Sequence, residues 1–309
     1  MAIDKGAQLT DIRMQALDKR IQQNYAAALS SAIQQQQAAI RQLAAFDASK
    51  FPDMTAEQMQ AQRIVYVNRI DKQTNVVRAL ASEIAQGGQG AARVIQSEML
   101  NVFGINLDWA EYSIDRQAGL LMNWQIYDQR QLQVLLEDGA SPFTRIAYDN
   151  LGKEQPIVNK LKNELTQAVM LGESQGELIK RIRNVTGQSI SQARRVAQTE
   201  RNRVQSQARF MGMQEAEQMG IDMGKRWLSR MDSRVRDVHA AVTGEEVANE
   251  DTFSNGLMYP GDPAGAAYQI VNCRCVLQPM VLNVPNSVKA YRAQMRKSYG
   301  FDEWRASRA

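Results

Sequence analysis

Apolar side chains recur every three or four residues through most of the first 220 positions of this 309-residue chain. The clearest N-terminal stripe consists of Leu17, Ile21, Tyr25, Leu29 and Ile33. This spacing places the side chains on one face of a helix, and glutamine-rich positions occupy the opposite face. We therefore predict a long helix from about residue 9 to residue 46.

A second long helix is predicted after a break at Phe51-Pro52-Asp53. Thr55 is a suitable N-cap, because Glu57 and Gln58 follow it in the first turn. The glycine-rich run 87–90 is expected to end this helix. Two long helices with a short connection form a hairpin, which fits either a plain bundle or a projecting arm that docks a partner.

Residues 155–220 repeat the helical pattern in three pieces. Gly172 and Gly187 are expected to separate these pieces, with Ser174 and Ser189 as caps for the helices that follow. The last piece ends at Gly220 and carries a basic set on one face: Arg194, Arg195, Arg201, Arg203 and Arg209. Two interpretations remain open, a solvated helix face and a surface that contacts nucleic acid or an acidic partner.

The pattern changes after Gly220, where glycine and proline become frequent. Residues 225–229 and 271–277 are predicted to form strands, with a long loop-rich segment between them. We predict a mainly α fold, in which a long N-terminal helical hairpin or bundle (residues 1–150) precedes a small α+β C-terminal domain with a loop-rich insertion (residues 155–281). Residues 287–309 are predicted to form a basic helical tail.

Composition narrows the possible chemistry. The chain has a net charge of +4, two cysteines and one histidine, which excludes a disulfide framework and a histidine-rich metal site. No run of 18 apolar residues is present, so we expect no transmembrane helix and no membrane partner. The N-terminus lacks the features of a signal peptide, and we expect the protein to stay in the cytoplasm of the cell that makes it.

The single histidine and both cysteines fall within residues 227–275. His239, Cys273 and Cys275, joined by Asp237 or Asp232, have the residue types of a four-coordinate zinc site. Alternatively, the cysteines pack as small apolar residues and His239 bonds to a loop carbonyl. A metal-dependent nuclease that uses Asp232, Asp237 and His239 is a further hypothesis.

The same segment resembles the phage Mu F-like minor head proteins, also called the phage head morphogenesis family. The residues that carry the resemblance are Thr199, Glu200, Trp227, Asp232, Arg234, Asp237, His239, Gly244, Pro260, Asp262, Pro263, Asn272, Cys273 and Cys275. The resemblance covers residues 155–281. The chain departs from the family pattern at Gln198, where arginine is usual, and at Ile270-Val271, where many members have His-Pro.

The resemblance implies a non-enzymatic minor capsid protein of a tailed phage that needs no cofactor. Such proteins associate with the portal vertex during procapsid assembly and aid DNA packaging, retention or ejection. The implied partners are the portal protein and the major capsid or scaffold protein. Residues 1–150 would dock the portal or scaffold, and the protein would move from the host cytoplasm to the head interior near the portal vertex.

Contact with double-stranded DNA would fall to Arg194, Arg195, Arg201 and Arg203. The alternatives are a metal-dependent nuclease or toxin-like enzyme delivered with the phage DNA, and a non-specific DNA-binding module.

Overall fold

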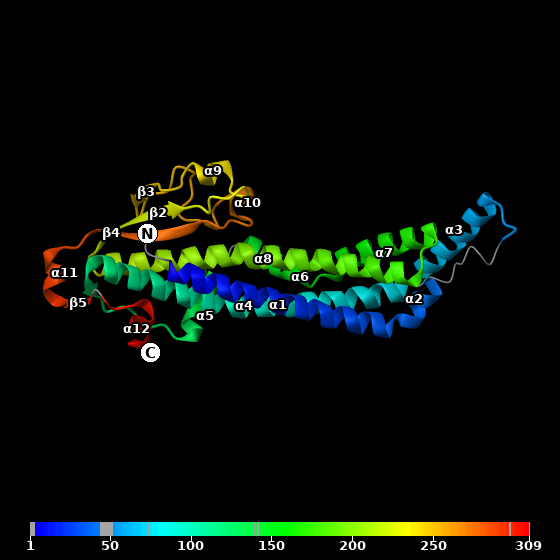
Figure 1. Cartoon of the computed structure of the whole chain (residues 1–309), viewed down its shortest axis with the longest axis horizontal. Coiled ribbons are helices and arrows are strands. Elements are labelled where there is room, and N and C mark those ends of the chain that lie inside the picture. Colours follow the sequence, from blue (N-terminus) through cyan, green and yellow to red (C-terminus); the bar gives the residue numbers. More distant parts are fainter. Residues whose placement is uncertain are drawn as a thin grey trace. The chain divides into compact units, whose positions relative to one another are not determined.

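The computed structural model of the chain describes residues 4–43, 52–72, 74–138, 140, 142–296 and 298–308 (Figure 1). The side chains of residues 66–72, 74, 138, 142 and 143 are not part of this description. Phe51, in the predicted break between the first two helices, lies outside the described residues. Helices dominate the described part of the chain, which confirms the predicted mainly α class.

The helices are α1 (Lys5–Gln35), α2 (Gln37–Leu43), α3 (Ala56–Lys72), α4 (Thr74–Ala118), α5 (Gln129–Asp138), α6 (Pro142–Leu151), α7 (Glu154–Leu171), α8 (Gln175–Gln218), α9 (Asp237–Ala240), α10 (Ala267–Ile270), α11 (Asn286–Tyr291) and α12 (Phe301–Ala306). The strands are β1 (Leu120–Leu121), β2 (Asp222–Leu228), β3 (Glu246–Ala248), β4 (Val276–Asn283) and β5 (Ala293–Gln294).

The chain forms two compact units that are not consecutive in sequence. One comprises residues 1–17, 96–145 and 195–309, and the other comprises residues 18–95 and 146–194. This division differs from the predicted boundary between residues 150 and 155. The reason is that α1, α4 and α8 each contribute residues to both units, so the order of segments along the chain does not define the compact parts.

Several helix boundaries follow the predicted start and stop signals. Thr55 and Gln58 form a reciprocal capping box, in which the backbone N–H of each residue donates to the side-chain oxygen of the other, at 2.9 and 3.3 Å. Helix α7 ends at Gly172, whose φ of 65° is left-handed. The backbone N–H of Glu177 donates to Ser174 Oγ at 3.4 Å, so Ser174 caps α8 as predicted.

The prediction that Gly87–Gly90 ends a helix is wrong, because α4 runs without interruption from Thr74 to Ala118. These glycines are required by close packing instead. A Cβ added at Gly88 would lie 1.8 Å from the carbonyl oxygen of Leu151, and one at Gly90 would lie 2.2 Å from Asn24 Oδ1. Glycine at these positions therefore lets neighbouring segments approach the α4 backbone.

The expected interruption at Gly187 is also absent, since α8 continues through it from Gln175 to Gln218. Serine side chains near this point donate to carbonyls one turn earlier: Ser189 Oγ to Val185 O at 3.3 Å and Ser191 Oγ to Gly187 O at 2.9 Å. Ser189 therefore lies inside a helix rather than at its cap. A single glycine lowers helix stability but does not by itself end a helix that is packed along its length.

The small C-terminal sheet has the strand order β3-β2-β4, and all its pairs are antiparallel. Strand β2 confirms the predicted strand at residues 225–229. The second predicted strand, 271–277, begins later than expected: Asn272 lies in a turn, and β4 starts only at Val276. The loop-rich segment between β2 and β4 contains only β3, α9 and α10, which agrees with the predicted insertion (Figure 1).

The C-terminal tail is not the single helix that we predicted for residues 287–309. It forms α11, then β5, which pairs with β1, and then α12. The tail is anchored by aromatic side chains, because Phe301 and Trp304 are buried and their rings lie 5.4 and 5.9 Å from that of Tyr112. These contacts favour packing of short segments over one continuous exposed helix.

A buried carboxylate joins α4 to this tail. Asp115 accepts hydrogen bonds from the backbone N–H of Met122 at 3.1 Å and from Trp124 Nε1 and Trp304 Nε1, each at 2.9 Å. Burial raises the pKa of Asp115 to about 6, although these three donors favour the ionised form.

The glycine packing predicts that Gly88→Ala destabilises the protein by roughly 3 kcal/mol, since the new methyl group would overlap a backbone oxygen. Gly187→Ala is the matched control, because an added Cβ there meets no atom within 4 Å in the described structure. In chemical denaturation, the control should gain up to about 1 kcal/mol from helix propensity. Equal effects of the two substitutions would contradict the packing argument.

The environment of Asp115 predicts a pH-dependent stability difference. Its folded pKa of about 6 exceeds the usual unfolded value of about 3.9, so the contribution of Asp115 to stability is greatest below pH 4 and is lost as pH rises from 4 to 6. Relative to Asp115→Asn, the wild-type protein should lose about 2–3 kcal/mol over this range, measured by denaturation at each pH. Effects of other titrating groups cancel in this difference, and parallel pH curves would contradict the assignment.

Candidate functional site

The middle of α8 is buried, although the arginine pattern suggested an exposed basic face. Seven polar side chains in this stretch are buried: Glu200, Arg201, Asn202, Arg203, Gln205, Ser206 and Arg209. The arginines among them form ion pairs. Arg201 pairs with Asp11 at 2.5 Å, Arg203 with Glu200 at 2.9 Å, and Arg209 with Asp4 at 2.7 Å. Charged groups survive in such surroundings only when they are paired in this way.

The predicted set of nucleic-acid contacts is therefore divided. Arg201 and Arg203 are only 5% and 4% exposed, so the prediction that they meet DNA phosphates is wrong for this conformation. Arg194 and Arg195 are exposed on α8, and Arg194 forms an ion pair with Asp18. The sequence pattern gave the wrong prediction for Arg201 and Arg203, because the spacing of arginines does not distinguish a solvent-exposed face from one that contacts buried carboxylates.

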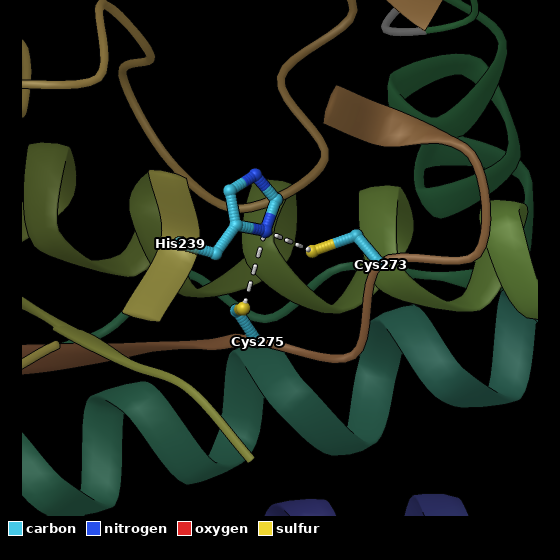
Figure 2. Close-up of side chains that lie close together, drawn as sticks. All are labelled: His239, Cys273 and Cys275. Atoms are coloured by element: carbon cyan, nitrogen blue, oxygen red, sulfur yellow. Dashed lines mark hydrogen bonds between the residues drawn. The ribbon is translucent and has the colours of Figure 1, made fainter. Parts of the chain in front are cut away.

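His239, Cys273 and Cys275 lie together in the C-terminal part of the chain (Figure 2). His239 Nδ1 is 3.6 Å from Cys273 Sγ and 3.5 Å from Cys275 Sγ, and the three ligand atoms all lie within 4.8 Å of one another. All three side chains are at least 97% buried. Among the described residues, this is the one group of histidine, cysteine or acidic side chains whose ligand atoms converge in this way.

The two thiols differ in acidity. The pKa of Cys275 is lowered, mainly because its sulfur accepts a hydrogen bond from the Cys273 thiol. The same hydrogen bond and burial raise the pKa of Cys273.

His239 is fixed by side chains from β2 and the loop that follows it. The indole of Trp227 packs edge-on against the imidazole, with ring centroids 5.1 Å apart, and against Phe253 at 5.2 Å. Ser229 Oγ accepts a hydrogen bond from Trp227 Nε1 at 3.0 Å and donates to the carbonyl of His239 at 2.6 Å. Ser229 Oγ also lies 3.4 Å from Cys275 Sγ, so it touches both sides of the cluster.

The turn that carries the cysteines is held by α8. Asn272 has a φ of 57°, and its backbone N–H donates to Thr199 Oγ1 at 3.1 Å. Gln198 Nε2 donates to the carbonyl of Cys273 at 3.3 Å. Arg236 donates to the carbonyl of Val271 from the other side. Thr199 and Gln198 on α8 therefore position the turn that carries Cys273 through hydrogen bonds to its backbone.

Asp232 does not join the cluster as the zinc hypothesis allowed. It forms a two-pronged ion pair with Arg274 at 2.6 and 2.7 Å and accepts a hydrogen bond from the backbone N–H of Arg234 at 3.0 Å. The Arg274 guanidinium holds the pKa of Asp232 well below its usual range. This pair ties the loop after β2 to the residue between the two cysteines.

Asp237 is also absent from the converging group, which corrects its prediction as a metal ligand. It is exposed in the first turn of α9, two positions before His239, and side chains two apart on a helix point in different directions. The same arrangement disfavours the nuclease hypothesis, because Asp232, Asp237 and His239 do not converge within the described part of the chain.

The remaining motif residues shape the loops around the cluster. Gly244 has a φ of 84°, and its N–H donates to the carbonyl of Trp227 at 2.8 Å. Asp262 accepts hydrogen bonds from the backbone of Met258 and of Ala264, each at 2.9 Å, within the turn that Pro260 and Pro263 flank. Between them Gly261, with a φ of 83°, leaves room for the α8 backbone, since a Cβ there would lie 3.0 Å from Arg203 N.

Sequence reasoning missed the roles of Ser229, Gln198 and Arg236 beside the cluster. No pattern marks Ser229, because a serine after a strand is common in loops. Gln198 and Thr199 were the available signal for contact with this turn, because they lie in the part of the family motif that α8 carries. In the structure both side chains bond to the turn that carries Cys273.

Comparison with known proteins follows the same residues. A family model described as Phage Mu protein F like protein matches residues 159–278. The chain is 21% identical over 219 residues to minor head protein GP7 of Bacillus phage SPP1, which covers 69% of each chain. No solved structure matches the chain significantly.

A second relative carries an enzyme name. The chain is 30% identical over 156 residues to NAD(+)–arginine ADP-ribosyltransferase EFV of Enterococcus faecalis. That alignment covers 49% of this chain but only 32% of the relative, so this chain spans about a third of the enzyme's length.

No helix in the described residues combines the length and apolar composition that a membrane span requires. The family match coincides with the segment whose motif residues build the His239, Cys273 and Cys275 cluster and its supporting contacts. Residues 159–278 are therefore similar to the phage Mu F-like proteins, and a wider part of the chain is similar to a phage minor head protein.

Proposed function

We propose that this protein is a minor head component of a tailed phage that associates with the portal vertex during procapsid assembly. In this role it would contact the portal protein and the major capsid or scaffold protein. It would move from the host cytoplasm into the head interior near the portal and aid DNA packaging, retention or ejection. The observation that carries the proposal is the similarity to the SPP1 minor head protein, which extends over 69% of both chains.

A structural role fits the way the family segment is built. The motif residues described above contact one another and the backbone, as in the Asp232–Arg274 pair and the Thr199–Asn272 hydrogen bond. Such contacts stabilise the loops around the cluster. This arrangement supports a scaffold function for the segment over a catalytic one.

The helical N-terminal part is the proposed docking region. Ile64 and Val65 are 48% and 46% exposed on α3, a helix that is otherwise mostly polar. Large apolar side chains at an exposed helix surface are the type of residue that anchors a protein interface. We therefore assign the portal or scaffold contact to α3 within the predicted arm, residues 1–150.

The docking proposal predicts that the protein co-purifies with portal protein and is present in few copies in procapsids and virions. Combined Ile64→Glu and Val65→Glu substitutions should weaken portal capture about tenfold or more, because charges replace apolar anchors. The measurement is a pull-down with tagged portal protein, together with mass spectrometry of purified particles.

Leu282→Glu is the matched control, since Leu282 is 58% exposed but lies in β4, outside the proposed arm. It should leave portal capture unchanged. A loss of capture in this control alone would move the docking surface to the region around β4. Absence of the protein from both procapsids and virions would overturn the proposed function.

A contact with packaged double-stranded DNA would rest on Arg194 and Arg195, since the other two predicted contacts are buried ion pairs. Two arginines neutralise few phosphates and give weak binding with a shallow salt dependence. We therefore propose DNA contact as an auxiliary property of the assembled particle and not as the main activity.

We propose that the protein has no enzymatic activity of its own, and the enterococcal relative defines the test. Purified protein incubated with labelled NAD+ and an arginine-rich acceptor should transfer no ADP-ribose above a no-protein control. The reason is that the similarity covers only 32% of that relative, so most of the enzyme has no counterpart in the alignment. Transfer above background would restore the enzymatic alternative.

A further inference from the structure

In the buried cluster of His239, Cys273 and Cys275, one ring nitrogen lies close to both sulfurs. His239 Nδ1 lies 3.6 Å from one sulfur and 3.5 Å from the other (Figure 2). An imidazole nitrogen carries either one hydrogen or one in-plane lone pair, so it can serve only one of the two thiols well. Two sulfurs at nearly equal distance from one nitrogen indicate a shared centre between the three atoms.

The distances fit a tetrahedral metal ion. With Zn–S bonds of about 2.3 Å and Zn–N bonds of about 2.1 Å, a tetrahedral site separates nitrogen from sulfur by about 3.6 Å. The observed separations are 3.6 and 3.5 Å, and the three atoms lie within 4.8 Å of one another. Two thiolates and one imidazole form a soft donor set, which favours zinc over calcium, magnesium or manganese.

The ligands are held by contacts that do not depend on one another. Trp227 and Ser229 fix His239, whereas Thr199 and Gln198 fix the turn that carries Cys273. His239 Nε2 is buried and has no hydrogen-bond partner among the described residues. The polar contacts of the imidazole are therefore those that Nδ1 makes with the two sulfurs. Such independent support lets a site persist before the ion arrives.

We propose that His239 Nδ1, Cys273 Sγ and Cys275 Sγ bind one Zn²⁺ ion, with a water molecule as the fourth ligand. Binding releases the two thiol protons to solvent, and the two thiolates then balance the charge of the ion. A small pocket borders the three ligands, and its other polar lining residues are Arg230, Arg234, Arg236, Asn272 and Arg274. Asp232 is excluded because Arg274 holds it, and Asp237 lies outside the converging group.

The test is metal analysis of the full chain produced in zinc-supplemented medium and dialysed against metal-free buffer. We expect about one zinc per chain in the wild-type protein. Cys273→Ser combined with Cys275→Ser, and separately His239→Gln, should reduce the zinc content to near zero. Asp237→Asn is the matched control, because it removes an exposed carboxylate two residues from His239, and it should retain the metal.

Cobalt substitution keeps the test decisive if the ligand variants fail to fold. Wild-type protein reconstituted with Co²⁺ should show the intense visible bands of a tetrahedral site and a near-ultraviolet sulfur-to-cobalt charge-transfer band. Less than about a tenth of an equivalent of zinc in the wild type, with no tetrahedral cobalt spectrum, would overturn the proposal. Full zinc content in the folded cysteine variant would overturn it as well, since the ion would then lie elsewhere.

Discussion

The burial of charged side chains in the middle of α8 is the constraint on which the surrounding structure depends. Arg201, Arg203 and Arg209 are nearly inaccessible, and a buried guanidinium without partners would cost several kcal/mol. Segments distant in sequence supply the partners of Arg201 and Arg209, whereas the partner of Arg203 is local. Asp4 and Asp11 come from the N-terminus, Glu200 from α8 itself, and the Leu277 carbonyl from β4, which accepts from Arg209 at 3.1 Å. The contacts of Arg201 and Arg209 therefore hold the N-terminal segment and β4 against the helix.

The same stretch of α8 explains why the motif residues in the helix and in the C-terminal loops belong together. Thr199 precedes Glu200, and its hydroxyl accepts a hydrogen bond from the backbone N–H of Asn272. The backbone of Arg203 packs closely against Gly261. A Cβ at Gly261 would press on the α8 backbone, and a residue without a hydroxyl at position 199 would leave the Asn272 N–H without this acceptor. The helix thus acts as a template on which the turn bearing Cys273 is shaped.

The sequence was informative where a local signal decides the structure and misleading where tertiary contacts decide it. The Thr55 cap, the Gly172 stop and strand β2 follow from local chemistry, and the structure has them. Gly88 gave the wrong answer because glycine serves equally as a helix end and as a site of close approach, and only the position of Leu151 distinguishes the two. The arginines of α8 failed for a similar reason, since their carboxylate partners lie up to about 200 residues away. The convergence of His239 with the two cysteines was anticipated from residue types alone, whereas the exclusion of Asp237 required the helical geometry of α9.

The loop-rich segment between β2 and β4 has little regular structure to stabilise it, since it contains only a three-residue strand and two four-residue helices. Its ends are joined at the cluster, where His239 meets Cys273 across 34 residues. In a chain-entropy treatment, closing a loop of that length by a cross-link restricts the unfolded chain by about 4 kcal/mol, comparable to a large share of the stability of a small domain. Asp232–Arg274 closes nearly the same loop by an ion pair on the exposed side, where solvent screening makes the contact weak. A strong bond at the buried cluster would therefore add more stability to this segment than one at the exposed ion pair. This is a structural reason for metal-binding residue types to occupy the cluster, while the other motif residues shape loops.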